Sequence, residues 1–437
     1  MPAPQRISAV LEPAVGQRRS GQDSSAPRIA VLTAGRDKPY ALGLASALMA
    51  HGETFDFITG DAVDAPELHG NPQIKCLNLR NQRVDAGLLQ KMTRVFVYYL
   101  RLIGYAFTAQ PKIFHILWNN KFELFDRTLL MLYYKLLGKK IVFTAHNVNA
   151  GTRDANDSFL NWFSLKIQYR LSDHIFIHTQ IMKNELVSGF SVPPDKATII
   201  PFGINNTVPN TALTCAEARR ELGIDPHDKT LLFFGNIAPY KGLEYLVTAF
   251  IELEKKSPGH RLVIAGRVKE CEDYWAQIQK TISSSGVSDR ITQRIEYVPD
   301  EQTELYFKAA DVLVLPYTHI FQSGVLFLGY SFGLPVIAAD VGSLKDEIVE
   351  GRTGFVSRPQ DSSDLVAVLE KYFSCDLYLD LDSKRQAIRD YANERYSWAK
   401  VATMTADVYS ELIRSRHSFS ETPDATRLAP GMADTRK

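Results

Sequence analysis

The sequence predicts an α/β protein made of two doubly wound, Rossmann-like domains that face each other across a cleft. From Arg28 onward, short apolar runs alternate with longer stretches of helical periodicity, which is typical of parallel strands joined by crossover helices. The alternation stops in a polar, turn-rich segment at 201–211 and then starts again, so the chain holds two such units. Its 437 residues are enough for two or three domains. Ligands of such sheets bind beyond the carboxyl ends of the strands, which places the expected site between the domains.

The first domain is expected at 28–203. Residues 39–52 have the spacing of a helix, and Gly52 suits its C-cap. The short apolar runs between the helical stretches have the length of buried strands. They lie at 28–34, 55–60, 113–118, 140–146, 174–179 and 197–203.

The second domain is expected at 204–395. Thr214 and Glu217 have the spacing of a capping box, which begins a short helix that ends at Gly223. Strands are expected at 230–236, 261–266, 294–299, 311–317, 335–340 and 353–357. The C-terminal helix that follows, 396–415, is amphipathic and fits against either domain.

Composition and the two ends limit the class of protein. A leader at 1–27 and a tail at 416–437 are rich in polar residues and are expected to be disordered, and the leader lacks the apolar core of a secretion signal. Lys plus Arg is 50 and Asp plus Glu is 49, which argues against a nucleic-acid partner. The four cysteines have no CxxC metal or redox spacing, which fits a reducing, cytoplasmic location. No cofactor is expected.

Two loops of the second domain point to a phosphate ligand. Within 233–250 a strand ends at Gly235 and Asn236, and Lys241 stands at the mouth of the next helix, where backbone N–H groups favour an anion. The alternative is an ordinary surface lysine. The second loop contains Gln322-Ser323-Gly324, which leads into a helix and lets phosphate oxygens approach the backbone. A plain strand–helix–strand unit is the alternative there.

Other nucleotide-binding motifs are absent, and one first-domain histidine is a candidate. No two glycines are separated by a single residue, so the dinucleotide fingerprint G-x-G-x-x-G is missing. His146 ends a strand run within 143–149 and is expected to face the cleft, where it would bond a sugar hydroxyl or stabilise developing charge. A structural histidine is the alternative. His174 and His178 flank another strand and are expected to be structural.

The runs FFGNIAPYKGLEYLVTAF, LVIAGRV, ADVLVLPY and SFGLPVIAADVGSLKDEIVEGRTGFV resemble, in order and spacing over 230–357, the donor-binding domain of the group-1 retaining glycosyltransferases of GT-B fold. The first half is similar in rhythm and in the histidine of FTAHN. The resemblance implies a nucleotide-sugar donor on the second domain, with Lys241 on its diphosphate, an acceptor on the first domain, and no metal. The loops on the acceptor side would then hold Gly35, Arg36, Asp37 and Asn147.

Three positions depart from the family pattern. Asn236 stands in the place of the family's arginine, and Ile320 and Leu328 stand where the family carries two glutamates, the second of which contacts the donor ribose. Ribose hydroxyls without an acceptor would cost about 1–3 kcal/mol, so we expect another residue to supply the contact. Arg267 follows strand 261–266 and is a candidate for the missing arginine. The loop around Gln322 resembles an exopolysaccharide-type subset that lacks the second glutamate.

The resemblance implies a hexosyltransferase, retaining and independent of metal, that moves a sugar from a nucleotide-sugar to a glycan or lipid-linked saccharide in cell-surface polysaccharide synthesis. An inverting enzyme would instead need a first-domain carboxylate, for which Asp37 and Asp154 are the candidates. Two alternatives stay open. One is a catalytically silent nucleotide-sugar-binding or scaffold protein, and the other is a different GT-B enzyme such as a sugar epimerase or a phosphorylase.

One stretch of the first domain favours a membrane surface. No apolar run reaches the roughly 18 residues that span a bilayer. A basic, aromatic helix can instead lie at the interface, here the inner face of the membrane. The alternative is a crossover helix buried in the domain. The stretch runs from Lys91 to Phe107 and contains Arg94, Phe96, Tyr98, Tyr99, Arg101 and Tyr105.

Overall fold

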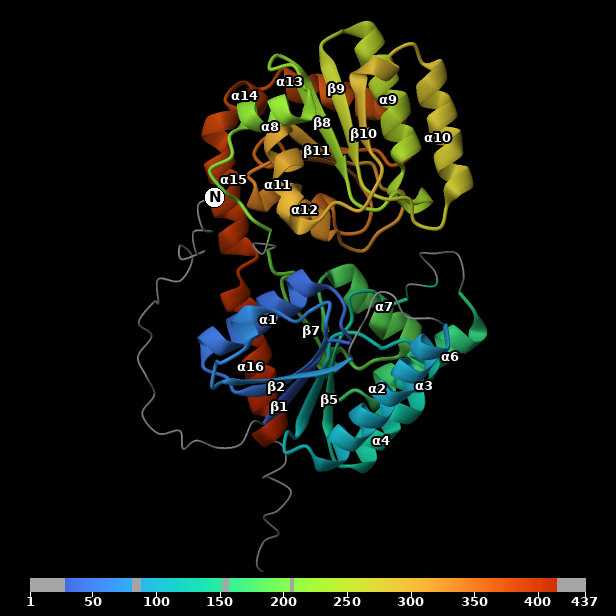
Figure 1. The fold of residues 1–437 in the computed structure, drawn as a ribbon, viewed down its shortest axis with the longest axis vertical. Helices are drawn as coiled ribbons and strands as arrows, with labels where there is room; N and C mark the ends of the chain where they lie inside the picture. Colours follow the sequence, from blue (N-terminus) through green and yellow to red (C-terminus); the bar gives the residue numbers. More distant parts are fainter. Residues whose placement is uncertain (1–27, 81–87, 150, 152–156, 205–207, 415–437) are drawn as a thin grey trace, which may run out of the picture.

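A computed structural model describes residues 28–80, 88–149, 151, 157–204 and 208–414 of the chain. Two α/β domains lie one above the other, each with a twisted parallel sheet between layers of helices (Figure 1). The fold class predicted from the sequence is therefore confirmed. The leader at 1–27 and the tail at 416–437 lie outside the described residues.

The first domain contains a seven-stranded parallel sheet in the order β3-β2-β1-β4-β5-β6-β7. Its central strands are buried along their whole length, as expected for a sheet with helices on both faces. The strands are β1 Ile29–Leu32, β2 Phe55–Gly60, β3 Ile74–Arg80, β4 Ile113–Ile116, β5 Lys140–Thr144, β6 His174–Ile177 and β7 Ala197–Ile199.

Helices cover both faces of this sheet. One face carries α2 (Leu88–Thr108), α4 (Met131–Leu136), α6 (Phe159–Leu171) and α7 (Gln180–Phe190), whose apolar side chains share one core. The short α3 (Glu123–Phe125) runs into a π-helical turn, Asp126–Leu130, and then into α4. The short 3-10 helices are η1 Pro66–Leu68 and η3 Pro194–Lys196.

The opposite face is covered by α1 (Lys38–His51) and by the C-terminal helix α16 (Trp398–Arg414). After the second domain the chain therefore returns and packs α16 against α1, which Figure 1 shows as a red helix beside a blue one. Tyr409 of α16 reaches the core and places its hydroxyl 2.6 Å from Nδ1 of the buried His115. The C-terminal helix, which fits either domain by its sequence, belongs to the first.

The second domain contains a six-stranded parallel sheet in the order β10-β9-β8-β11-β12-β13. Its strands are β8 Lys229–Phe234, β9 His260–Ala265, β10 Ile291–Arg294, β11 Val312–Leu315, β12 Val336–Ala339 and β13 Gly354–Ser357. Its helices are α8 Cys215–Leu222, α9 Leu243–Lys256, α10 Glu272–Ser284, α11 Asp300–Ala309, α12 Gly324–Ser331, α13 Ser362–Phe373, α14 Asp376–Leu379 and α15 Leu381–Arg395. Short 3-10 helices lie at η4 Pro239–Lys241, η5 Ser288–Arg290 and η6 Lys345–Glu347.

Local signals in the sequence place several element ends correctly. Thr214 and Glu217 form both hydrogen bonds of a capping box at the start of α8, and Gly223 ends it in the left-handed conformation. Gly52 likewise caps α1. The prediction of a strand at 294–299 is wrong, because the edge strand β10 begins at Ile291 and ends at Arg294. Ile291 pairs with Leu262 of β9 and is buried, whereas Tyr297 is exposed.

The two passages of the chain between the domains touch each other. The backbone N–H of Ile204 donates to the carbonyl of Tyr396, and the indole N–H of Trp398 donates to the carbonyl of Ile204. The Trp398 ring fills the space left by two glycines, since a Cβ at either Gly43 or Gly203 would lie 2.3 Å from it. This tryptophan therefore ties both passages to α1 at the junction of the domains.

Candidate active site

A pocket of about 300 Å³ opens between the two domains, at the carboxyl ends of their strands. The first domain and the crossing segments supply Asp37, Pro39, Tyr40, Phe202, Gly203 and Trp398. The second domain supplies Tyr240, Lys241, Tyr317, Ile320, Gln322, Ser323, Gly324, Val325 and Leu328. The cleft expected from two facing sheets is thus a defined cavity, mostly apolar with a few charged and polar groups.

Lys241 is the cation of this pocket. It ends η4, between β8 and α9, and only 7% of the residue is exposed. Its ammonium lies 5.2 Å from the centre of the Tyr317 ring and next to Gly235, where a Cβ would stand 3.0 Å from it. Burial lowers the pKa of this lysine. Among the described residues it has no ion-pair partner, so the protein buries a positive charge beside an open cavity.

The second positive feature is the beginning of α12. Ser323 occupies the N-cap position, but its side chain caps none of the N–H groups of the helix. Its hydroxyl lies 3.5 Å from that of Tyr317 instead. The first N–H groups of an eight-residue helix therefore begin at the pocket wall, on the same side as Lys241. Lys241, Ser323 and Gly324, singled out from the sequence, come together here.

Gln322 adds an amide to the same wall. Its Nε2 donates to Oε1 of Glu347 at 3.3 Å, while its Oε1 has no hydrogen-bond partner among the described residues. Glu347 is buried, which raises its pKa, and it also accepts a bond from the hydroxyl of Tyr396. The buried Glu347 thus holds Gln322 in place in the pocket wall.

The two positions that lack glutamates do line the pocket. Ile320 and Leu328 present apolar side chains to it, beside Val325. In the described part of the second domain, no acidic residue lines the cavity. The departure from the family pattern therefore changes the chemistry of the site itself.

Gly235, Asn236 and Arg267 are not among the residues that line the pocket. The guanidinium of Arg267 donates from Nε to the side-chain oxygen of Asn236 at 3.3 Å and lies over the ring of Tyr297. Arg267 thus stands beside the position where the family carries an arginine, but it is exposed and is not a lining residue of the pocket. Its contact with the donor stays a prediction.

Asp37 faces the pocket from the first domain. It stands in the left-handed conformation, with φ 45°, and caps α1 by accepting a bond from the N–H of Tyr40. Asp37 is exposed to the cavity, yet the protein atoms that form the cavity walls partly desolvate its carboxylate, which raises its pKa, although the bond from Tyr40 lowers it. Gly35 and Arg36 belong to the same turn, and Asn147 is half-buried away from the lining. Asp154 lies outside the described residues.

His146 lies one aromatic layer behind the pocket. Its ring stacks on Trp118 at 4.4 Å between centres, and the ring of Tyr40, which lines the cavity, meets its edge at 4.6 Å. Nδ1 is 3.2 Å from Nε2 of His178. Burial, with the neighbouring histidines adding to it, lowers the pKa of His146 well below its usual value, so the ring is neutral at neutral pH. Its direct action on a substrate stays a prediction.

Sequence reasoning missed the aromatic residues of the pocket. Tyr40, Phe202 and Trp398 meet at the domain junction, where Tyr40 lies 5.4 Å from Phe202 and 5.2 Å from Trp398 between ring centres. They come from α1, the linker and α16, so only the tertiary fold brings them together. Gly43 inside a helix was the available signal, because a glycine there leaves room for a large neighbour.

Exposed apolar side chains occur on α2, on the run α3–α4 and on α6. On α2, Tyr98 and Tyr99 are buried and hydrogen-bonded to Asn120 and Asp126, so these two tyrosines are not on the surface as the membrane prediction had them. Exposed apolar side chains on the three helical runs are Met92, Phe96, Leu100 and Phe107, then Leu124, Leu129, Leu132 and Leu136, then Phe159, Leu160 and Phe163. Among the described helices, none is long and apolar enough to cross a membrane.

Each domain of the chain matches a known protein family. Residues 216–395 match the family Glycosyl transferases group 1, and residues 39–208 match Glycosyltransferase Family 4. The two matches fall on the second and the first domain. The chain therefore belongs to the group-1 glycosyltransferases, and its two facing domains form the GT-B fold.

Individual relatives agree with this assignment. The chain is 27% identical over 248 residues to the D-inositol 3-phosphate glycosyltransferase of Corynebacterium aurimucosum, which covers 55% of this chain and 57% of that one. It is 30% identical over 257 residues to the enzyme of the same name from Streptomyces scabiei, covering 57% and 56%. The matched region thus spans little more than half the length of these curated relatives.

Solved structures share the fold. Sucrose-phosphate synthase from Thermosynechococcus elongatus superposes with a TM-score of 0.69 at 18% identity, covering 90% of this chain and 100% of that one. HepE of Anabaena, solved in complex with UDP, superposes with a TM-score of 0.67 at 15% identity, covering 88% and 100%. At these identities the likeness establishes the fold alone.

Proposed function

We propose that the protein transfers a hexose from a nucleoside diphosphate sugar to a glycan or lipid-linked saccharide, as an exopolysaccharide-type member of its family. The observation that carries this proposal is the buried Lys241, which has no ion-pair partner within the described residues and lies beside the start of α12 in the pocket. A buried cation next to helix N–H groups suits a diphosphate ligand. The phosphate oxygens would accept charge-assisted hydrogen bonds from the lysine and the N–H groups, which lack these bonds in the free protein. HepE, which shares the fold, is described as binding UDP.

The pocket supports a mechanism without a metal. Cleavage of the sugar–phosphate bond leaves added negative charge on the departing diphosphate, and fixed donors can stabilise it. Lys241 and the first N–H groups of α12 stand on one wall to do so. Gln322, held by Glu347, is our candidate acceptor for donor hydroxyls in place of the absent glutamate; its Oε1 is buried and has no partner among the described residues, so a turn of the side chain must bring it to the ligand.

We further propose that the sugar keeps its anomeric configuration. With Ile320 and Leu328 in place of glutamates, the departing phosphate takes the acceptor proton, so that no carboxylate base is needed. Proton NMR of the first product, recorded before anomers equilibrate, tests this: a retained anomer is expected. An inverted product would contradict retention and would make Asp37, the carboxylate lining the described pocket, the base.

Asp37 is expected to hold an acceptor or sugar hydroxyl from the first domain. Asp37→Asn keeps the N-cap and tolerates the left-handed backbone, so the melting temperature should stay close to that of the wild type. A charge-assisted bond to a hydroxyl is lost, and kcat/KM should fall by about 10-fold or more.

The role of Asp37 also predicts how kcat/KM depends on pH. The pKa of Asp37 is raised, so its carboxylate is present above that raised value and is lost as the pH falls through it. Wild-type kcat/KM should therefore decline on the acid side earlier than an ordinary aspartate would cause, and Asp37→Asn should lack this decline. If both profiles show the same acid limb, Asp37 does not have this role.

We also propose that the enzyme works at the inner face of a membrane. Four free cysteines fit a reducing compartment. The exposed apolar side chains of α2, α3–α4 and α6 have exposed basic groups near them in the sequence, at Arg101, Lys121 and Lys166, and the exposed Glu123 is paired with Arg127. Apolar side chains with basic neighbours are suited to an anionic lipid surface, where a lipid-linked acceptor would be held.

Liposome flotation tests the membrane proposal. The wild type should float with anionic vesicles at low salt, and the triple variant Phe96→Ser/Leu100→Ser/Phe107→Ser should stay in solution. Leu379→Ser, which removes an equally exposed apolar side chain from the second domain, is the matched control and should float. A wild type that stays in solution, or a triple variant that floats normally, would contradict the proposal.

The choice of donor can be read from thermal stability. A ligand that binds only the folded state raises its stability, by about 2.7 kcal/mol at 100 times Kd. Nucleoside diphosphate sugars should raise the melting temperature, and the sugar 1-phosphates without a nucleotide should not. Equal shifts with both sets would argue against a nucleotide-sugar site.

A further inference from the structure

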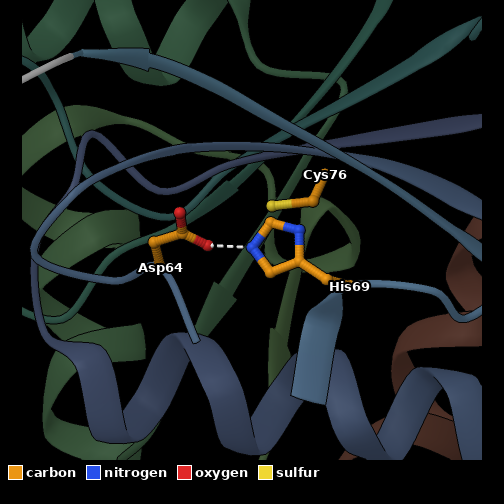
Figure 2. A group of neighbouring side chains, drawn as sticks. All are labelled: Asp64, His69 and Cys76. Carbon is orange, nitrogen blue, oxygen red and sulfur yellow. Dashed lines mark hydrogen bonds and ion pairs between the residues drawn. The ribbon is translucent and has the colours of Figure 1, made fainter. Parts of the chain in front are cut away.

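Three side chains with metal-binding chemistry meet at the outer edge of the first domain. Asp64 follows β2, His69 follows η1, and Cys76 lies on the edge strand β3. One ligand atom from each lies within 4.8 Å of the other two. Figure 2 shows the carboxylate of Asp64 and the sulfur of Cys76 both directed to the ring of His69. None of the three lines the interdomain pocket.

The backbone that carries this cluster is well anchored. The loop after β2 turns back through η1 and buries Val63, Ala65 and Leu68. The N–H of Val63 donates to Gly60 at 2.9 Å, and the N–H of His69 donates to Pro66 at 3.1 Å. Cys76 is fixed on its side by the pairing of β3 with β2. Because the backbone of both the loop and the strand is fixed, mainly rotations of the three side chains would be needed to bring their ligand atoms around a metal ion.

The contacts inside the cluster leave ligand capacity unused. Oδ1 of Asp64 lies 2.6 Å from Nε2 of His69. The thiol of Cys76 makes no hydrogen bond within the described part of the chain, whereas those of Cys271 and Cys375 donate to backbone carbonyls. A partly buried thiol therefore faces an aspartate–histidine pair without a hydrogen-bond partner of its own.

We propose that Asp64, His69 and Cys76 bind one Zn²⁺ that fastens the loop after β2 to the edge strand β3. A thiolate, an imidazole and a carboxylate are the ligand types of zinc, and three protein ligands leave a fourth position for water. Thiolate and carboxylate together carry two negative charges, which balance the dication. Mg²⁺ and Ca²⁺ prefer oxygen ligands and are not expected to bind.

The required movement is small. Zinc bonds of about 2.0–2.3 Å in a tetrahedral arrangement place ligand atoms roughly 3.4–3.6 Å apart. Oδ1 of Asp64 and Nε2 of His69 would move apart by about 1 Å from their present 2.6 Å. The sulfur of Cys76, whose distance to the other two ligand atoms is now at most 4.8 Å, would move closer to them. His69 is exposed, so its ring is free to make this adjustment.

Metal binding to the full chain, stripped of metal beforehand, tests this site. The wild type should take up one equivalent of Zn²⁺ in competition with a chromophoric chelator. With Co²⁺ as a probe it should show a thiolate-to-cobalt charge-transfer band. Cys76→Ser should abolish that band, and His69→Ala and Asp64→Asn should each weaken Zn²⁺ binding by about tenfold or more. Melting curves of the stripped proteins establish that the variants are folded.

Matched controls separate the site from general surface binding. His51 is a second exposed histidine of this domain, 3.7 Å from Glu53, and Cys375 is another free cysteine. His51→Ala and Cys375→Ser should bind Zn²⁺ as the wild type does. A wild type without stoichiometric binding, variants at the three positions that bind normally, or controls that lose binding equally would each overturn the proposal. Sugar transfer plays no part in this test, so its outcome is independent of the proposed function.

Discussion

Replacing Lys241 by methionine is expected to weaken the binding of a nucleoside diphosphate sugar by about 1.5–3 kcal/mol, roughly 10- to 150-fold in Kd. The lysine is buried and has no ion-pair partner among the described residues, so the donor diphosphate is the anion that its position favours. Methionine keeps most of the side-chain volume while removing the charge. Isothermal titration calorimetry with the donor measures the loss.

The same substitution should leave the free protein at least as stable as the wild type. A buried charge without a partner costs free energy, and its removal relieves that cost. The combination of unchanged or raised melting temperature with lost affinity is what distinguishes a ligand-binding lysine from a structural one. Lys269→Met, at an exposed position of the same domain, is the control and should bind normally. Unchanged donor affinity in Lys241→Met would show that Lys241 is not the diphosphate contact.

The second large effect is expected at Gly242, directly after this lysine. Gly242 has φ 62° and is the N-cap of α9, and a Cβ there would lie 2.1 Å from the carbonyl oxygen of Pro316. Gly242→Ala should lower the free energy of unfolding by about 2–5 kcal/mol. About 1–2 kcal/mol comes from the left-handed alanine and about 1–3 kcal/mol from the overcrowding.

Donor binding should weaken too, because the clash would push the Lys241 turn away from the loop that carries Tyr317. Gly223→Ala is a close control, since Gly223 has φ 67° but open space around its Cβ position. It should lose only the backbone part, about 1–2 kcal/mol, and should bind the donor as the wild type does. Chemical denaturation of the three proteins measures the difference. Equal losses in both variants would mean that the contact with Pro316 is not a constraint.

Sequence periodicity was sufficient to predict the two sheets because most strands are buried on both faces. Such strands are continuous apolar runs, as at β4 and β11, and are recognisable without their neighbours. The edge strand β3 was missed because its outer positions are polar and partly exposed, which weakens the pattern. Edge strand β10 was displaced for a related reason, since only Ile291 of that strand is buried.

In the candidate site, Lys241 and Ser323-Gly324 could be predicted because each stands where a strand ends and a helix begins, a relation that is local in sequence. Trp398 could not be predicted, because it comes from a helix that returns from the other domain. The position of His146 behind the pocket could not be predicted either, because the ring of Tyr40, on the distant helix α1, lies between His146 and the cavity. Periodicity also gave no means to tell which face of α2 is buried, because both faces contain aromatic residues.

Turnover of a labelled donor tests the central claim, that this member of the family is an active glycosyltransferase and not a silent binding or scaffold protein. The enzyme is incubated with a labelled nucleoside diphosphate sugar that stabilises it and with lipid and glycan fractions as acceptors, and products are analysed by mass spectrometry. We predict that labelled sugar appears in an acceptor in a one-to-one ratio with released nucleoside diphosphate, and that Lys241→Met lowers both together. A donor that binds but is never consumed, or one that is only converted into an isomeric nucleotide-sugar, would contradict the account.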